Sequence, residues 1–162
     1  MNNEKLSLDG LIFEATKVVM KDYILTITLN RPNKKNAINS VMMNEVNYAL
    51  AYAKQERKIR VVIIDAEGDI FCAGADLSNP KSESNVPKLT DHDDLSLSIR
   101  HLYKPVICKI QGSVLAGALL IVANATHAVA VKDAKFSAPE IKRGLWPFMV
   151  MAGLFRVMPK RA

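Results

Sequence analysis

The chain is organised around the stretch IFCAGADL, residues 70–77. An apolar run, Val61 to Ile64, comes just before it, and a polar segment with little pattern follows it. The small residues in its middle leave little side chain to shield the backbone, so such a turn presents its amide N–H groups to whatever binds there. We therefore interpret the rest of the chain as a frame for these amides and for one carboxylate that faces them.

Length and composition indicate one globular domain. The 162 residues are enough for a sizeable core, and 49% hydrophobic with 23% charged residues is a typical globular balance. The formal net charge of +6 would attract an anionic ligand. The chain has no Arg-rich tract and no interleaving of aromatic and basic residues, which disfavours a nucleic-acid binder.

Cysteine and histidine usage argues against disulfides and metals. Cys72 and Cys108 are the only cysteines, too few for a disulfide framework and not spaced as a metal pair. His92, His101 and His127 lack zinc spacing. The polar start and the lack of an apolar run of about 20 residues disfavour a secretory signal and a membrane span. We expect a cytoplasmic protein with no metal and no membrane partner.

The hydrophobic patterning predicts an α/β fold. We expect strands at 11–15, 17–20, 23–29, 60–64, 105–110, 127–131 and 135–137. The run at 60–64 is unbroken and apolar, as in a buried parallel strand. We expect helices at 39–57, 93–103, 116–125 and 148–157, with a loop over 79–94.

Two glycine-containing turns follow apolar runs. Residues 73–75 come after 61–64, and residues 115–118 come after 106–110. In parallel α/β sheets, ligands bind beyond the carboxyl ends of the strands, where the start of a helix also offers free amides. Two converging N–H groups would stabilise an oxyanion. The simpler alternative is that both turns serve only tight packing.

Glu140 is the candidate carboxylate. It follows Pro139 and has Ile141, Leu145 and Trp146 as apolar neighbours, which would disfavour its charged form and suit it to proton transfer. A solvated loop carboxylate or a helix cap is the alternative. Trp146 itself is expected in the core. Cys72 has no basic partner placed to activate it, so we interpret it as a buried structural thiol.

Four spaced blocks resemble the crotonase family of enoyl-CoA hydratases and isomerases. They are LNRP (29–32) with KNAI (35–38), FCAGADL (71–77), KPVI (104–107) with Gly112 and AGA (116–118), and KFSAPE (135–140) with Gly144 and Leu145. Each block is weak alone. Together, in this order over most of residues 20–160, they are specific at family level.

The resemblance implies a crotonase-like spiral of β-β-α units that binds an acyl-CoA thioester and stabilises an enolate. Coenzyme A would be part of the substrate, and no separate cofactor is implied. The N–H groups of Ala75 and Gly117 would form the oxyanion hole. The resemblance further implies adenine and pantetheine contacts on the backbone around Ala37, Ala73, Asp76 and Leu77.

The resemblance also implies which reaction is favoured. Family hydratases use two glutamates: Glu140 matches one, but Leu120 stands at the position of the other, and leucine cannot take a proton from water. One acid/base suffices to move a proton between two carbons of an enolate, so isomerase-like chemistry at Glu140 is favoured. The alternatives are a non-catalytic CoA-thioester-binding module and an inactive fragment.

Family members resembling this chain continue into a C-terminal helical segment that walls the acyl pocket and builds trimers or hexamers. The sequence ends at Ala162, after the last predicted helix. We therefore expect a truncated chain whose apolar residues between 149 and 158 are poorly covered. Such a surface favours association over a well-behaved monomer.

Overall fold

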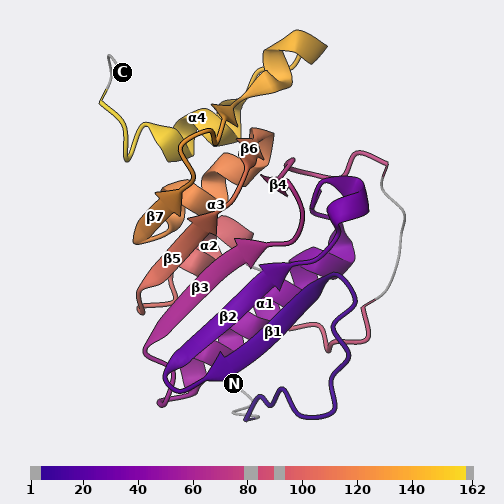
Figure 1. The fold of residues 1–162 in the computed structure, drawn as a ribbon, viewed down its shortest axis with the longest axis vertical. Helices are drawn as coiled ribbons and strands as arrows, with labels where there is room; N and C mark the ends of the chain where they lie inside the picture. Colours follow the sequence, from indigo (N-terminus) through magenta and orange to yellow (C-terminus); the bar gives the residue numbers. More distant parts are fainter. Residues whose placement is uncertain (1–4, 79–83, 90–93, 160–162) are drawn as a thin grey trace.

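The computed structural model describes residues 5–78, 84–89 and 94–159. They form two sheets, with strand orders β1-β2-β3-β5-β7 and β4-β6-β8 (Figure 1). The large sheet contains β1 (Thr16–Lys21), β2 (Ile24–Leu29), β3 (Val61–Ala66), β5 (Val106–Ile110) and β7 (His127–Ala130). The small sheet contains β4 (Ile70–Cys72), β6 (Ser113–Leu115) and β8 (Phe136–Ser137). Only the β1–β2 pair is antiparallel among these described strands.

Four α-helices and three short 3₁₀ turns join the strands. The helices are α1 (Ser40–Gln55), α2 (Leu95–Arg100), α3 (Leu119–Asn124) and α4 (Phe148–Leu154) among the described residues. The 3₁₀ turns are η1 (Pro32–Lys34), η2 (Ala116–Ala118) and η3 (Pro139–Arg143). None of these helices is long and apolar enough to cross a membrane.

From β3 onward the elements repeat in one order: a strand of the large sheet, a strand of the small sheet, then a helix. The three units are β3-β4-α2, β5-β6-α3 and β7-β8-α4. The successive strands of each sheet are parallel neighbours, so each unit adds one strand to both sheets. This confirms the predicted spiral of β-β-α units.

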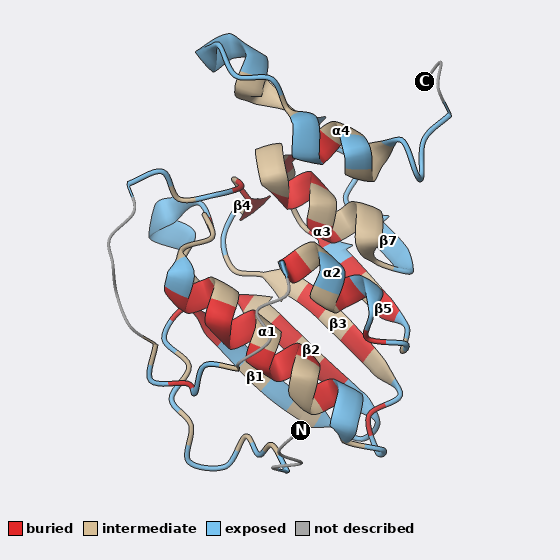
Figure 2. Ribbon diagram, turned by 180° about the vertical axis from the view of Figure 1, so that it is seen from behind, coloured by how far each residue is buried: buried red, intermediate tan, exposed pale blue. Residues whose placement is uncertain are grey.

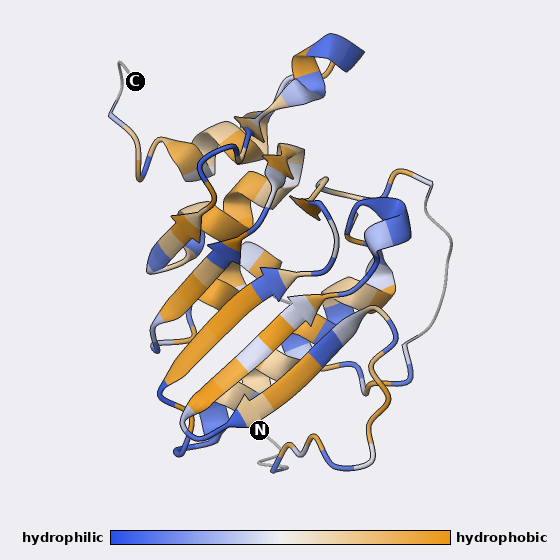
Figure 3. Cartoon of the chain, in the orientation of Figure 1, coloured by the Kyte–Doolittle hydropathy of each residue, from blue (hydrophilic) through white to orange (hydrophobic). Residues whose placement is uncertain are grey.

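The core lies between the large sheet and the helices on one of its faces. Figures 1 and 2 show α1, α2 and α3 on the same side of the sheet. In β2 the buried residues Leu25, Ile27 and Leu29 alternate with more exposed ones. The side chain of Asn39 accepts a hydrogen bond from Met42 N and caps α1. Figure 3 shows the apolar character of β2, β3 and β5.

Burial along β3 differs from the prediction. Val62 and Ile64 are buried, but Val61 and Ile63 are only half-buried. The unbroken apolar run had indicated a strand covered on both faces. The helices cover one face, so burial alternates even though hydrophobicity does not.

The expected strand at 11–15 is wrong. The buried carboxylate of Glu45 on α1 accepts hydrogen bonds from Glu14 N at 2.7 Å, Ala15 N at 3.0 Å and the Thr16 hydroxyl at 2.8 Å. Because a side chain takes these backbone donors, this segment does not pair as a strand, and β1 begins only at Thr16.

The other differences concern short elements. The strands β4 and β6 were not predicted, because three residues carry no readable period. The predicted helix at 116–125 begins with the 3₁₀ turn η2, and α2 and α4 are shorter than expected. Residues 84–89 of the expected loop contain no helix or strand, and its other parts at 79–83 and 90–93 lie outside the described residues.

Large apolar side chains gather unburied around α4. The exposed fractions of Phe148, Met149 and Phe155 are 73%, 66% and 61%, whereas Val150 packs inward and is buried. The expectation of poor coverage is therefore confirmed for Met149, Phe155, Val157 and Met158, but not for Val150 or for the half-buried Met151 and Leu154. Figure 3 shows the apolar character of α4.

We predict that the 162-residue chain self-associates through this face, because clustered exposed apolar surface favours association. Light scattering should show species larger than a monomer, and the double substitution Phe148→Ser with Phe155→Ser should reduce them. Val19→Ser is the matched control, since Val19 is 59% exposed on the distant strand β1. A sharp monomer peak with cooperative unfolding of the unmodified chain would contradict the prediction.

Candidate active site

The small sheet gathers the three predicted site segments at one end. Its strands are parallel, with Cys72 paired to Val114 and Leu115 paired to Ser137. The chain therefore leaves β4, β6 and β8 at the same edge. Ala75 follows β4, Gly117 follows β6, and Glu140 follows β8.

The two turns follow different strands from those predicted. Residues 73–75 were expected directly after the run at 61–64, and residues 115–118 directly after the run at 106–110. Those runs are β3 and β5 of the large sheet, and the short strands β4 and β6 stand between them and the turns. The rule that ligands bind beyond the carboxyl ends of parallel strands applies here to the small sheet.

The two glycine turns touch. A Cβ atom on Gly74 would lie 2.9 Å from Ala116 Cβ and 3.1 Å from Gly117 N, closer than side chains normally approach. Gly74 also has a φ of +87°, which other residues rarely adopt. A glycine at this position is therefore required both by backbone conformation and by space.

The amide of Ala75 points away from the neighbouring backbone. In the parallel bridge between Ile38 and Ala75, Ile38 N donates to Gly74 O at 2.8 Å and Asp76 N donates to Ile38 O at 2.9 Å. The polar groups flanking Ala75 thus face Ile38, and those of Ala75 itself face the other way. Its N–H has no acceptor among the described residues, and Ala75 is exposed.

The amide of Gly117 is likewise unpaired within the described part of the chain. It lies in the first turn of η2, where N–H groups have no acceptor in the helix. The preceding residue, Ala116, has a φ of +53°, an unfavourable conformation for alanine. A Cβ on Gly117 would meet no atom within 4 Å, so open space lies beside this amide.

Glu140 lies in η3 and is half-buried. Its Oε2 atom is buried and has no hydrogen-bond partner in the described structure. Ile141, Leu145 and Trp146, the apolar neighbours expected beside it, are themselves exposed, with exposed fractions of 63%, 55% and 56%. Trp146 is not a core residue. Figure 1 shows why: the chain between the end of β8 and α4 extends outward from the two sheets before it returns.

Leu120 packs between helices. A Cβ on Gly153 in α4 would lie only 2.3 Å from Leu120 Cδ2. The residue in α3 at which the family resemblance expects a second glutamate in hydratases therefore presents hydrocarbon to α4.

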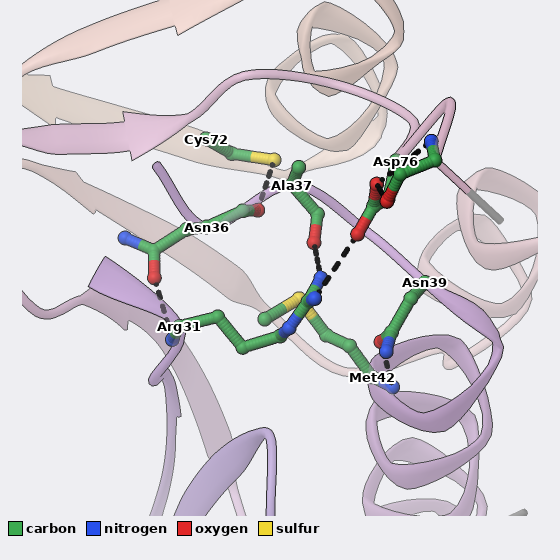
Figure 4. A network of polar contacts seen from close by, with 8 residues as sticks. Arg31, Asn36, Ala37, Asn39, Met42, Cys72 and Asp76 are labelled. Carbon is green, nitrogen blue, oxygen red and sulfur yellow. Dashed lines mark hydrogen bonds and ion pairs between the residues drawn. The ribbon is translucent and has the colours of Figure 1, made fainter. Parts of the chain in front are cut away.

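Arg31 joins the segments around Ala75 and was missed as a functional candidate, although it stands in the quoted LNRP block (Figure 4). Its guanidinium donates to Ala37 O and, at 3.0 Å, to Asp76 Oδ2. Hydrogen bonds from Ser78 and from Arg31 hold the pKa of Asp76 below its usual value. Of the other predicted coenzyme A contacts, Ala37 and Ala73 are half-buried, and Leu77 is 69% exposed.

Cys72 is a structural thiol, as predicted. It is buried, and its Sγ donates to Asn36 O at 3.1 Å. Burial raises the pKa of Cys72 to about 11 and that of Cys108 to about 12, so neither is a thiolate near neutral pH. Both thiols are free. Within the described ranges, no group of three or more His, Cys, Asp or Glu residues is placed to hold a metal ion.

The spiral of β-β-α units places this chain among proteins with the crotonase fold. The crystal structure of an enoyl-CoA hydratase from Mycobacterium smegmatis superposes with a TM-score of 0.79 at 28% identity, covering 91% of this chain and 60% of that one. The sequence model for enoyl-CoA hydratase/isomerase matches residues 20–162. The chain belongs to the enoyl-CoA hydratase/isomerase family.

Curated relatives carry both activities of the family name. A mevalonyl-coenzyme A hydratase of Aspergillus fumigatus is 34% identical over 128 residues, which cover 76% of this chain and 47% of the relative. The 1,2-epoxyphenylacetyl-CoA isomerase of Escherichia coli is 29% identical over 135 residues, covering 76% and 50%. The chain thus spans about half the length of the curated relatives it matches.

The two glycines should respond differently to alanine. We predict that Gly74→Ala lowers the free energy of unfolding by about 1–3 kcal/mol, because of its positive φ and its contact with the second turn. Gly117→Ala should leave it unchanged or raise it by about 0.5 kcal/mol, since its methyl has room. Urea unfolding followed by circular dichroism measures both. Equal losses in the two variants would contradict the geometry.

The buried thiols should make stability fall at high pH. Both native pKa values are raised, so this contribution is fully present below the unfolded pKa of about 8.5 and is lost as pH rises through about 11. We predict that the unmodified chain loses more unfolding free energy between about pH 8 and pH 10.5 than the Cys72→Ala, Cys108→Ala double variant does. Equal losses of unfolding free energy in the two proteins would show that the buried thiols do not cause the fall in stability.

Proposed function

We propose that the protein binds an acyl-CoA thioester and stabilises its enolate with the backbone N–H groups of Ala75 and Gly117. The observation that supports this most is that the segments carrying Ala75, Gly117 and Glu140 leave the small sheet at the same edge, with both amides lacking an acceptor among the described residues. Backbone donors of this kind cost no reorganisation when charge develops on the thioester oxygen. Losing one such donor typically costs about 2.7–4 kcal/mol of transition-state stabilisation.

The proposed reaction is the isomerisation of a 3-enoyl-CoA to a 2-enoyl-CoA. The carboxylate of Glu140 removes a proton from the carbon next to the thioester, and the electron pair spreads into a dienolate whose oxygen the two amides hold. Glu140 then returns the proton to the far carbon of the original double bond, two carbons beyond the one that lost it, which leaves the new double bond next to the thioester. The carboxylate ends as it began, so no other reactant is needed.

Two features favour this reaction over hydration. Leu120 packs against Gly153 and offers no carboxylate to activate water. The unpartnered Oε2 of Glu140 leaves one acceptor free for a substrate proton. The names of the relatives include both a hydratase and an isomerase, so they support the family and do not choose between the two reactions.

Glu140→Gln tests the proposed acid/base. Glutamine keeps the size of the side chain but cannot take a proton, so we predict a loss of isomerase turnover of about 100-fold or more. Turnover of 3-enoyl-CoA is followed by the ultraviolet absorbance of the conjugated product, alongside a hydration assay on 2-enoyl-CoA. Glu56→Gln is the matched control, because Glu56 is likewise half-buried but lies at the end of α1.

Hydration without isomerisation, or isomerisation that survives Glu140→Gln, would refute the proposed reaction. The second candidate is a CoA-thioester-binding module without catalysis, which the hydrocarbon side chain of Leu120 at the expected position of a second carboxylate favours. Calorimetric binding of an acyl-CoA without turnover would support that candidate. A trimeric or hexameric assembly, a cytoplasmic location and the lack of a separate cofactor remain predictions.

A further inference from the structure

The segment from Arg31 to Ile38 holds the segment from Cys72 to Asp76 by a series of hydrogen bonds. Ala73 N donates to Lys35 O at 3.0 Å, and the Ile38 bonds described above hold Gly74 and Asp76. The Cys72 thiol adds a bond to Asn36 O. Every residue from Cys72 to Asp76 except Ala75 therefore makes a hydrogen bond to the segment from Arg31 to Ile38.

Asn36 fixes the shape of the holding segment. It is fully buried and has a φ of +52°, a conformation that asparagine tolerates better than most residues. Its side-chain oxygen accepts from Arg31 N at 2.8 Å, and its amide donates to Glu67 O and Ile70 O, each at 2.8 Å. These bonds tie the segment to the end of β3 and the start of β4.

Arg31 closes the two segments against each other (Figure 4). One guanidinium nitrogen donates to Ala37 O on its own segment, and another donates to Asp76 Oδ2 on the facing one. The side chains of Arg31 and Asp76 are only 16% and 8% exposed, so solvent screens this ion pair less than a surface pair. Asp76 directly follows Ala75, which makes this the nearest side-chain clamp to the free amide.

We propose that Arg31 is a positioning residue that sets the direction of the Ala75 N–H by clamping Asp76 to Ala37. This inference rests on the proposed function of that amide. An amide that makes no hydrogen bond of its own takes its position entirely from its neighbours. A planar guanidinium with several fixed donors suits a clamp on two acceptors better than the single ammonium of lysine does.

The test compares four variants of the full chain. Arg31→Ala removes the clamp, Arg31→Lys keeps only its charge, and Asp76→Asn keeps the shape of its partner without the charge. Lys34→Ala is the matched control, because it removes an exposed cation from the same segment without touching the clamp. Three quantities are measured: kcat and KM with 3-enoyl-CoA, the carbonyl frequency of a bound enoyl-CoA by Raman spectroscopy, and hydrogen exchange at the Ala73 and Asp76 amides.

We expect Arg31→Ala to lower kcat by about 100-fold while KM changes little, since misplacing a catalytic group by about 1 Å costs this much. The shift of the thioester carbonyl frequency on binding should shrink, and the Ala73 and Asp76 amides should exchange faster. Arg31→Lys and Asp76→Asn should show smaller losses of the same kind. Asp76→Asn keeps the test valid if Arg31→Ala fails to fold. Lys34→Ala should match the unmodified chain.

An unchanged kcat, carbonyl shift and exchange in Arg31→Ala would overturn the inference, as would equal losses in Lys34→Ala. If the unmodified chain neither turns over 3-enoyl-CoA nor shifts the thioester carbonyl frequency, the proposed function fails. Hydrogen exchange alone then decides whether Arg31 acts as a clamp. Faster exchange in Arg31→Ala but not in Lys34→Ala would then still support the clamp, and equal exchange would refute it.

Discussion

The contact between Gly74 and the turn at Ala116–Gly117 is the constraint on which the candidate site depends. A Cβ on Gly74 has no room, so only a glycine lets the two backbones come this close. The approach brings the turn that carries Ala75 against the turn that carries Gly117, and neither of these two amides has an acceptor among the described residues. Any larger residue at position 74 would push apart the two groups proposed to hold one oxygen.

Each repeating unit adds one strand to the large sheet and one strand to the small sheet, and the two sheets have different roles. In the large sheet, β2, β3 and β5 bury alternate apolar residues against α1, α2 and α3 (Figure 2). The short strands β4 and β6 add the buried residues Phe71, Cys72 and Val114 to the core. Each strand of the small sheet also ends just before a segment that carries a candidate site residue. A scaffold with a stable core can thus carry a site on strands too short to be stable alone.

The site is made mostly of backbone, and side chains act around it. Arg31, Asn36 and Asp76 hold segments in place, and Glu140 is the one candidate for proton transfer. Leu120, whose hydrocarbon side chain packs on α4, stands where the resemblance places a second carboxylate in hydratases.

The sequence by itself determined the elements with a clear local signal: β2 by its alternation, α1 by its helical pattern of apolar residues, and the family by spaced motifs that include Ala75, Gly117 and Glu140. Tertiary structure decided the rest. It made 11–15 irregular, because Glu45 on a distant helix takes the backbone donors, and it left Trp146 exposed, because no described element covers it. It also formed the clamp from Arg31 to Asp76 and the small sheet, since both join residues far apart in the chain and no local pattern encodes which partners will meet.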